Sequence, residues 1–228
     1  DKFIVAESLY SHSGQRKKLN FDINKYPKFK SKIHYIVVEN EPQDLIKLDG
    51  LPYDHAQGMK RMNSLKRIRQ QYDVLREGIK DAQNDDLIIL SDCDEIFNPD
   101  KIQLRDDSFF LYEQLNIRFY GNYLDIHYPI WTKAVSFPMY KLKKLNLWDM
   151  HCLHYNKEKF GNEIINKIPY GGWHFSYLGG YDEIKRKLNH FHNNFIGKKN
   201  IPNLDKKYLI EKKIEYGLDI LNFNHFWD

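Results

Sequence analysis

Cysteine, net charge and long apolar runs are all scarce in this chain of 228 residues. Its two cysteines, Cys93 and Cys152, are too few for a disulfide framework or a zinc cluster, which predicts reduced thiols in a cytoplasmic protein. A net charge of only +4, with acids and bases interspersed, gives no reason to expect nucleic-acid binding. The apolar runs are too short to span a bilayer, and Asp1-Lys2-Phe3 lacks the layout of a signal peptide. We therefore expect a soluble protein without a transmembrane segment.

The hydrophobic content of 42% and the aromatic content of 15% are sufficient for a substantial core. At this length, the composition predicts a single domain over residues 1–228. The first strand-like run begins almost at the first residue, which leaves room for a further N-terminal strand in the natural protein.

Strand-like and helical patterns alternate along the chain, and this alternation is typical of an α/β protein. The predicted strands are 3–6, 33–38, 87–90, 116–120 and 134–140, and the predicted helices are 57–82, 181–192 and 204–221.

The long predicted helix carries both apolar and basic residues. Its apolar residues recur every three or four positions and predict one buried face, made by Met59, Met62, Leu65, Ile68, Tyr72, Leu75 and Ile79. The same geometry leaves the basic residues mostly solvated, while a phosphate contact is the alternative for Arg69.

Two carboxylates follow the apolar strand 87–90. If the chain stays extended there, Asp92 and Asp94 point to the same side and Cys93 faces the protein. Paired carboxylate oxygens suit a divalent metal, for example one that bridges them to a diphosphate. The alternative is a polar strand end whose aspartates cap the following turn.

A second dense segment, 171–180, holds one imidazole among four glycines and several aromatics. His174 together with carboxylates would suit an ion such as Mn²⁺, whereas a hydrogen-bonded core histidine is the alternative. Trp173 and Tyr177 can offer flat faces to a sugar, or belong to the core.

Three blocks in this order resemble glycosyltransferase family 17, the family of β-1,4-mannosyl-glycoprotein 4-β-N-acetylglucosaminyltransferases. The blocks are Phe3-Ile4-Val5-Ala6-Glu7-Ser8 with Ser11-His12-Ser13-Gly14 and Lys18-Leu19-Asn20-Phe21, Asp85-Asp86 with Ser91-Asp92-Cys93-Asp94-Glu95-Ile96, and Gly172 to Gly180 with Lys187-Leu188. The resemblance implies a GT-A type fold with a mixed central sheet flanked by helices. It also implies a UDP-sugar donor that is expected to carry N-acetylglucosamine, a glycan acceptor, Mn²⁺ or Mg²⁺, and inversion at the anomeric carbon.

Roles for individual residues follow from this chemistry. The growing charge on a nucleotide diphosphate leaving group calls for a cation. We expect Asp94 and His174 to bind it, with Asp92 reaching the metal or the ribose. Glu7, His12 and Arg69 are the further candidates for nucleotide-sugar binding. Glu7 stands at the end of a strand, where α/β sheets bind ligands, although a solvated strand end explains it too.

Inverting transfer also needs a base that accepts the proton of the acceptor hydroxyl. Asp149 is the first candidate and Asp125 the next, although a helix cap explains Asp149 equally well. Trp131 and Trp173 are candidates for the acceptor cleft, and a buried aromatic is the alternative for Trp131.

Two other classes of function compete with glycosyl transfer. A metal-dependent phosphohydrolase could use Asp92 as nucleophile and Asp94 as acid, but Glu95 and Ile96 fit its usual pattern poorly. A non-catalytic sugar-binding module could use the aromatics, but it would have no use for a buried carboxylate pair.

Overall fold

The chain folds into two units of different architecture, one made of Asp1–Gly78 with Gly179–Asp228 and the other of Ile79–Leu178. The computed structural model describes residues 2–103, 107–143, 145–155, 157–190 and 207–216. The single domain that the sequence predicts stays a prediction.

The first unit contains β1 (Phe3–Ser8), η1 (Ile23–Lys25), η2 (Lys30–Lys32), β2 (Ile33–Val38), α1 (Tyr53–Gly78), α3 (Tyr181–His190) and α4 (Lys207–Glu215). The second contains β3 (Leu87–Leu90), β4 (Glu95–Phe97), η3 (Pro99–Lys101), β5 (Phe109–Arg118), β6 (Tyr123–Leu124), β7 (Ile130–Trp131), β8 (Val135–Pro138), η4 (Met139–Lys143), α2 (Leu147–His151), η5 (Lys157–Phe160) and β9 (Ile165–Ser176). A mixed α/β architecture is thus confirmed.

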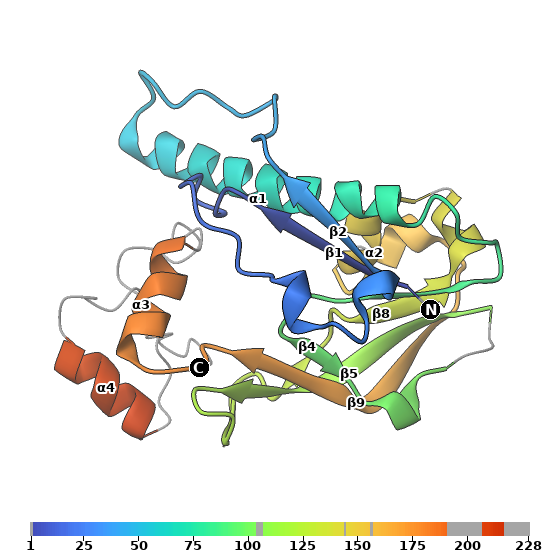
Figure 1. The fold of residues 1–228 in the computed structure, drawn as a ribbon. Coiled ribbons are helices and arrows are strands. Elements are labelled where there is room, and N and C mark those ends of the chain that lie inside the picture. The colour runs from blue at the N-terminus through green and yellow to red at the C-terminus, as the bar shows by residue number, and fades with distance from the viewer. Residues whose placement is uncertain (1, 104–106, 144, 156, 191–206, 217–228) are drawn as a thin grey trace. The chain divides into compact units, whose positions relative to one another are not determined.

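A mixed sheet forms the second unit, with the strand order β3-β8-β5-β9-β4. The long strands β5 and β9 run parallel, as Figure 1 shows, whereas the β3–β8, β8–β5 and β9–β4 pairs are antiparallel. The short strands β6 and β7 also pair with β5. Fully buried side chains from β5, β8 and α2 form the core, including Phe109, Leu111, Phe137 and Met150.

Strand β3 has the bounds that its apolar run predicted, but it lies at the edge of this sheet. Ile89 is consequently 43% exposed, which differs from the expected fully buried strand. The strand predicted over 116–120 corresponds to the end of β5. This strand begins at Phe109, seven residues before the predicted start. The sequence does not predict strand β9. Its end lies in the glycine-rich segment 171–180, and glycines weaken the pattern of a strand.

Gly172 marks a close approach between the backbones of β9 and β4. A Cβ atom there would lie 2.0 Å from the carbonyl oxygen of Ile96, and the φ angle of Gly172 is +148°. Only glycine satisfies both conditions without strain. The residue therefore keeps the two strands in direct backbone contact.

In the first unit, β1 and β2 form a parallel pair in the register Phe3↔Ile33 to Ser8↔Val38, and α1 packs on both strands. Gly78 ends α1 where a Cβ would lie 2.5 Å from the Ile4 side chain, so the helix end approaches β1 closely. Helices α3 and α4 agree with the predicted helices in the ranges 181–190 and 207–215. The remainder of those two predicted ranges lies outside the described residues, except for Tyr216.

The buried face of α1 differs in part from the predicted one. Met62 is 45% exposed, whereas Asn63 and Ser64 beside it are buried. The Asn63 amide explains this orientation because it bonds both backbone groups of Ile46, accepting from the N–H and donating to the carbonyl at 2.8 Å each. A buried amide with both partners satisfied competes well with an apolar side chain for an inward position.

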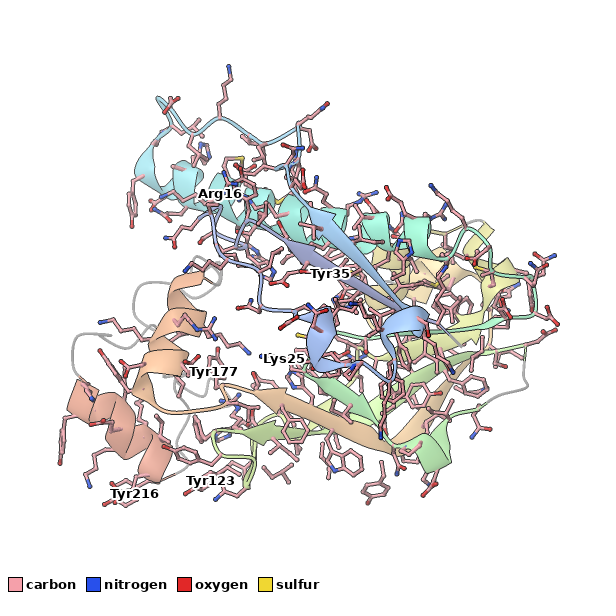
Figure 2. The ribbon with its side chains drawn as sticks, in the orientation of Figure 1. Arg16, Lys25, Tyr35, Tyr123, Tyr177 and Tyr216 are labelled. Carbon is pink, nitrogen blue, oxygen red and sulfur yellow. The ribbon has the colours of Figure 1, made fainter. Side chains whose placement is uncertain are left out.

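Glu7, the next-to-last residue of β1, anchors the loop that follows the strand. Its Oε1 accepts hydrogen bonds from Lys17 Nζ at 2.6 Å and from the backbone and side chain of Asn20 at 2.8 and 3.0 Å. Its Oε2 accepts from the Phe21 N–H and from the hydroxyl of Tyr35, both at 3.0 Å. Tyr35, labelled in Figure 2, lies on β2. Five donors use the whole acceptor capacity of one carboxylate, so Glu7 here serves the loop.

These bonds make Glu7 a source of pH-dependent stability. Burial alone raises the pKa of Glu7, but the hydrogen bonds from Lys17, Phe21, Asn20 and Tyr35 outweigh it and lower the pKa from 4.5 to about 2. The stabilisation is therefore fully present above pH 4.5 and is lost as the pH falls toward 2.

We expect Glu7→Gln to lower the free energy of unfolding near neutral pH by up to about 3 kcal/mol, because each pKa unit corresponds to about 1.4 kcal/mol. Urea titrations between about pH 7 and pH 2.5 measure the free energy of unfolding of both proteins. The difference between parent and variant should stay constant above about pH 4.5 and narrow as the pH falls toward 2. Glu77→Gln, at an exposed position on α1, is the control and should change the free energy of unfolding by less than about 0.5 kcal/mol. A gap of constant size for Glu7→Gln would show that its charge does not stabilise the loop.

Candidate active site

The predicted carboxylate pair lies in a tight turn between β3 and β4. The Glu95 N–H donates to the Asp92 carbonyl at 3.1 Å, and the Asp92 N–H donates to Glu95 Oε2 at 2.9 Å. These bonds bend the chain, so the alternation of an extended strand does not apply. The prediction that Cys93 faces the protein is therefore wrong, since its side chain is exposed at the turn. Asp92 and Asp94 are each partly buried.

Glu95, the first residue of β4, is the buried member of this turn, with 4% of its surface exposed. Its Oε1 accepts a hydrogen bond from Trp131 Nε1 at 2.6 Å. Burial raises the pKa of Glu95, and the charges of Asp92 and Asp94 raise it further, to about 8, against the lowering effect of its two hydrogen bonds. Glu95 thus resists ionisation at neutral pH, and a nearby cation would relieve its repulsion from Asp92 and Asp94.

His174 on β9 is buried next to this turn. Its cross-strand neighbours are Glu95 on β4 and Asn116 on β5, so the three side chains share one face of the sheet. Its Nε2 lies 3.8 Å from Asp94 Oδ2, and its Nδ1 lies 2.9 Å from Asn116 Oδ1. The Phe175 N–H also donates to the Asp94 carbonyl at 2.8 Å. Asp94 and His174, predicted from segments far apart in the sequence, are therefore brought together.

Trp131 joins the two halves of this cluster. Its ring stacks on the imidazole of His174, with centroids 4.1 Å apart and planes inclined by 7°. Because its N–H also binds Glu95, one side chain orients both a carboxylate and the histidine. Trp173 precedes His174 on the same strand and so points to the opposite face of the sheet, where it is 36% exposed. The two tryptophans predicted for the acceptor cleft therefore lie on different faces.

The chemistry of this cluster fits a divalent cation that is completed by a substrate. In the described part of the chain, no group of three or more His, Cys, Asp or Glu side chains is arranged to hold a metal on its own. Asp94 and His174 instead offer one oxygen and one nitrogen, which suit Mn²⁺. Neighbouring ligands about 2.1 Å from an ion lie about 3 Å apart, so the observed 3.8 Å needs only a small side-chain movement.

The two candidate bases have different surroundings. Asp149 on α2 is largely buried, and its Oδ1 accepts from Lys159 Nζ at 2.8 Å. The cap of α2 is Asn146, whose Oδ1 accepts from the Asp149 N–H, so Asp149 is not the N-cap residue. Asp125 is buried in an ion pair with Arg118 and accepts three further hydrogen bonds, which leaves it little capacity to accept a proton from a substrate.

The remaining candidates belong to the first unit. The carboxylate of Glu7 accepts hydrogen bonds from the loop that follows β1. The carbonyl of His12 accepts from Arg67 Nη1 at 3.2 Å. Arg69 is exposed and pairs with Asp73 at 3.5 Å, which agrees with the solvated position predicted for it rather than with the alternative, a phosphate contact. Arg67 rather than Arg69 is the more buried arginine of α1, and it also binds Glu41 Oε1 at 2.6 Å.

Comparison with known proteins decides between the classes of function that the sequence left open. The sequence model of glycosyltransferase family 17 matches residues 1–223. The chain belongs to glycosyltransferase family 17. This family 17 member is therefore a glycosyl-transferring enzyme with a donor and an acceptor substrate, rather than a phosphohydrolase or a non-catalytic binding module. No curated protein and no solved structure matches it significantly. None of the helices in the described residues has the length and apolar character that a membrane span requires.

Three polar residues of this glycosyltransferase were missed as site candidates by sequence reasoning. Glu95 and Asn116 become neighbours of His174 only through the pairing of β4, β5 and β9, which no local pattern reveals. His151 on α2 is 6% exposed. Burial lowers the pKa of His151 to about 4, the charge of Asp92 opposes this, and the charge of Lys133 supports it. A histidine at the end of a short helix gave no signal of its own.

We expect Trp131→Phe to destabilise the glycosyltransferase by about 1–3 kcal/mol, because the smaller ring can still stack on His174 but leaves buried Glu95 without the indole donor. Urea unfolding measures the change. Trp173→Phe, the same substitution at a more exposed position, is the control and should stay within about 0.5 kcal/mol of the parent. Equal losses in both variants would mean that the bond to Glu95 contributes nothing.

Proposed function

We propose that this glycosyltransferase moves N-acetylglucosamine from UDP-N-acetylglucosamine to a hydroxyl group of a glycan, with inversion and with Mn²⁺ or Mg²⁺. The observation that carries the proposal is the proximity of Asp94 and His174. Nε2 of His174 on β9 lies 3.8 Å from Oδ2 of Asp94, in the turn that also contains Asp92 and Glu95. The resemblance to family 17 supplies the donor and the stereochemistry as expectations. A GT-A type fold belongs to the same proposal.

Each proposed role follows from the surroundings of a residue. Asp94 and His174 would hold the cation, and Asp92 would reach the cation or the ribose. When bound, the cation would stabilise the negative charge that grows on the departing UDP. Trp131 and Glu95 keep His174 in place, through the stacked rings and the bond between indole and carboxylate.

Asp149 is the residue that we propose as the base. Its Oδ1 is held by Lys159, and its Oδ2 would take the proton from the acceptor hydroxyl as that oxygen attacks the anomeric carbon. Asp125 is a poor substitute because its oxygens are already used by Arg118, Asn116 and the backbone.

We expect Asp94→Ala to weaken Mn²⁺-dependent binding of UDP by at least about tenfold, because the variant loses one of two proposed metal ligands. Calorimetry with UDP in the presence and absence of Mn²⁺ measures this effect, and GDP serves as the comparison nucleotide, for which we expect weaker binding. Asp100→Ala is the control, since it removes an equal charge from the exposed helix η3. If Asp94→Ala binds UDP with Mn²⁺ as tightly as the parent, the metal assignment is wrong, and a preference for GDP would overturn the donor.

We expect Asp149→Asn to lower kcat by about 10²–10⁴-fold, because the amide is nearly isosteric but cannot accept the proton. Donor affinity should change little, so the loss should appear in kcat rather than in KM. Steady-state assays with UDP-N-acetylglucosamine and a panel of glycan acceptors measure both. Lys159→Met is the companion variant, since it removes the charge that holds Asp149 while leaving the carboxylate in place. A loss below about tenfold for Asp149→Asn would make Asp149 structural.

A further inference from the structure

The amide of Asn116 has only one orientation that satisfies its neighbours. Asn116 is 3% exposed on β5, and its Nδ2 lies 2.9 Å from the Tyr128 carbonyl and 3.2 Å from Asp125 Oδ2. A backbone carbonyl accepts hydrogen bonds and cannot donate them, and the same holds for a carboxylate. The NH₂ group must therefore occupy this side, and the amide oxygen must face the other way.

That orientation decides where the proton of His174 resides. The amide oxygen of Asn116 lies 2.9 Å from His174 Nδ1 and has no hydrogen to give. Nδ1 must then carry the hydrogen of the neutral ring, and Nε2 holds the lone pair. Nε2 is the nitrogen that lies 3.8 Å from Asp94 Oδ2.

Asp125 in turn keeps Asn116 from rotating. Its Oδ1 accepts from the backbone N–H groups of His127 and Tyr128 at 3.0 and 3.1 Å, so the carboxylate is fixed in its own loop. Its Oδ2 forms an ion pair with Arg118, whose guanidinium lies 5.7 Å from the ring centre of Tyr177. Tyr177 directly follows β9 (Figure 2). An ionised carboxylate presents only acceptors to Asn116, which reinforces the same amide orientation.

We propose that Asn116, held by Asp125, is a positioning residue that keeps His174 in the Nδ1–H tautomer and so keeps the lone pair of Nε2 directed toward the cation. The part of this inference that concerns the cation rests on the proposed function. The opposite tautomer would place an N–H at Nε2, which would donate to the Asp94 carboxylate and tie up both ligands in one charge-assisted hydrogen bond. Asn116 thus prevents the histidine and the aspartate from closing on each other.

Nitrogen NMR of the full chain tests the tautomer directly and needs neither metal nor substrate. At about pH 8, where an ordinary histidine is neutral, two-bond and three-bond couplings in ¹⁵N-histidine-labelled protein distinguish Nδ1–H from Nε2–H. His174→Gln identifies the signal by its loss. We expect the Nδ1–H form in the parent and a shift toward Nε2–H in Asn116→Ala. An Nε2–H ring in the parent overturns the inference, whether or not the variant folds.

Mn²⁺ binding followed by electron paramagnetic resonance tests the consequence for the cation. We expect Asn116→Ala to bind Mn²⁺ about 10–100-fold more weakly than the parent, as is usual when the partner of a metal-binding histidine is removed. Asn98→Ala is the matched control because this asparagine caps η3 and lies in the same unit.

The outcomes separate the inference from the proposed function. If the parent binds Mn²⁺ and Asn116→Ala binds it equally well, the positioning role is overturned while the metal site stands. If the parent binds no Mn²⁺, the proposed metal site fails and the cation part of the inference fails with it. The tautomer measurement then still decides the role of Asn116 toward His174.

Discussion

Repulsion among the carboxyl groups of one turn is the constraint on which the candidate site depends. Asp92, Asp94 and Glu95 leave β3 within four positions, and Glu95 is almost fully buried. Such groups persist together only if one of them holds a proton or if positive charge is supplied nearby. The raised pKa of Glu95 favours the retention of a proton, and the imidazole beside Asp94 provides a ligand for a cation. A bound cation would therefore lower the electrostatic repulsion among the carboxyl groups of this turn.

The pairing of strands in the mixed sheet fixes the positions of the side chains around this turn. Pairing of β4, β9 and β5 sets Glu95, His174 and Asn116 side by side, and Trp131 covers the histidine from β7. Each polar side chain in this row is oriented by another one, from the buried ion pair of Asp125 to the indole N–H on Glu95. Buried hydrogen-bonded networks of this kind favour one arrangement of side chains.

The sequence was informative where chemistry is local and uninformative where it depends on register. Strands β2 and β3 have the predicted bounds because short apolar runs define them. The proximity of Asp94 and His174 followed from the family resemblance rather than from either segment alone. The predicted orientation of Cys93 is wrong because two hydrogen bonds between Asp92 and Glu95 turn the chain where the prediction assumes an extended strand. Asn116 could not be recognised, since its role arises from β-sheet pairing across 58 positions of sequence.

Gly172 has a consequence for how this site can be transplanted or redesigned. With no room for a Cβ beside the Ile96 carbonyl, the distance between the carboxylate turn and the histidine strand is set by two backbones in contact. The segments 92–97 and 172–176 therefore form one structural unit, although they are far apart in the sequence. A graft that carries only one of the two segments loses the geometry of both, and a graft of the two segments alone loses Asn116 and Trp131, which lie between them in the sequence.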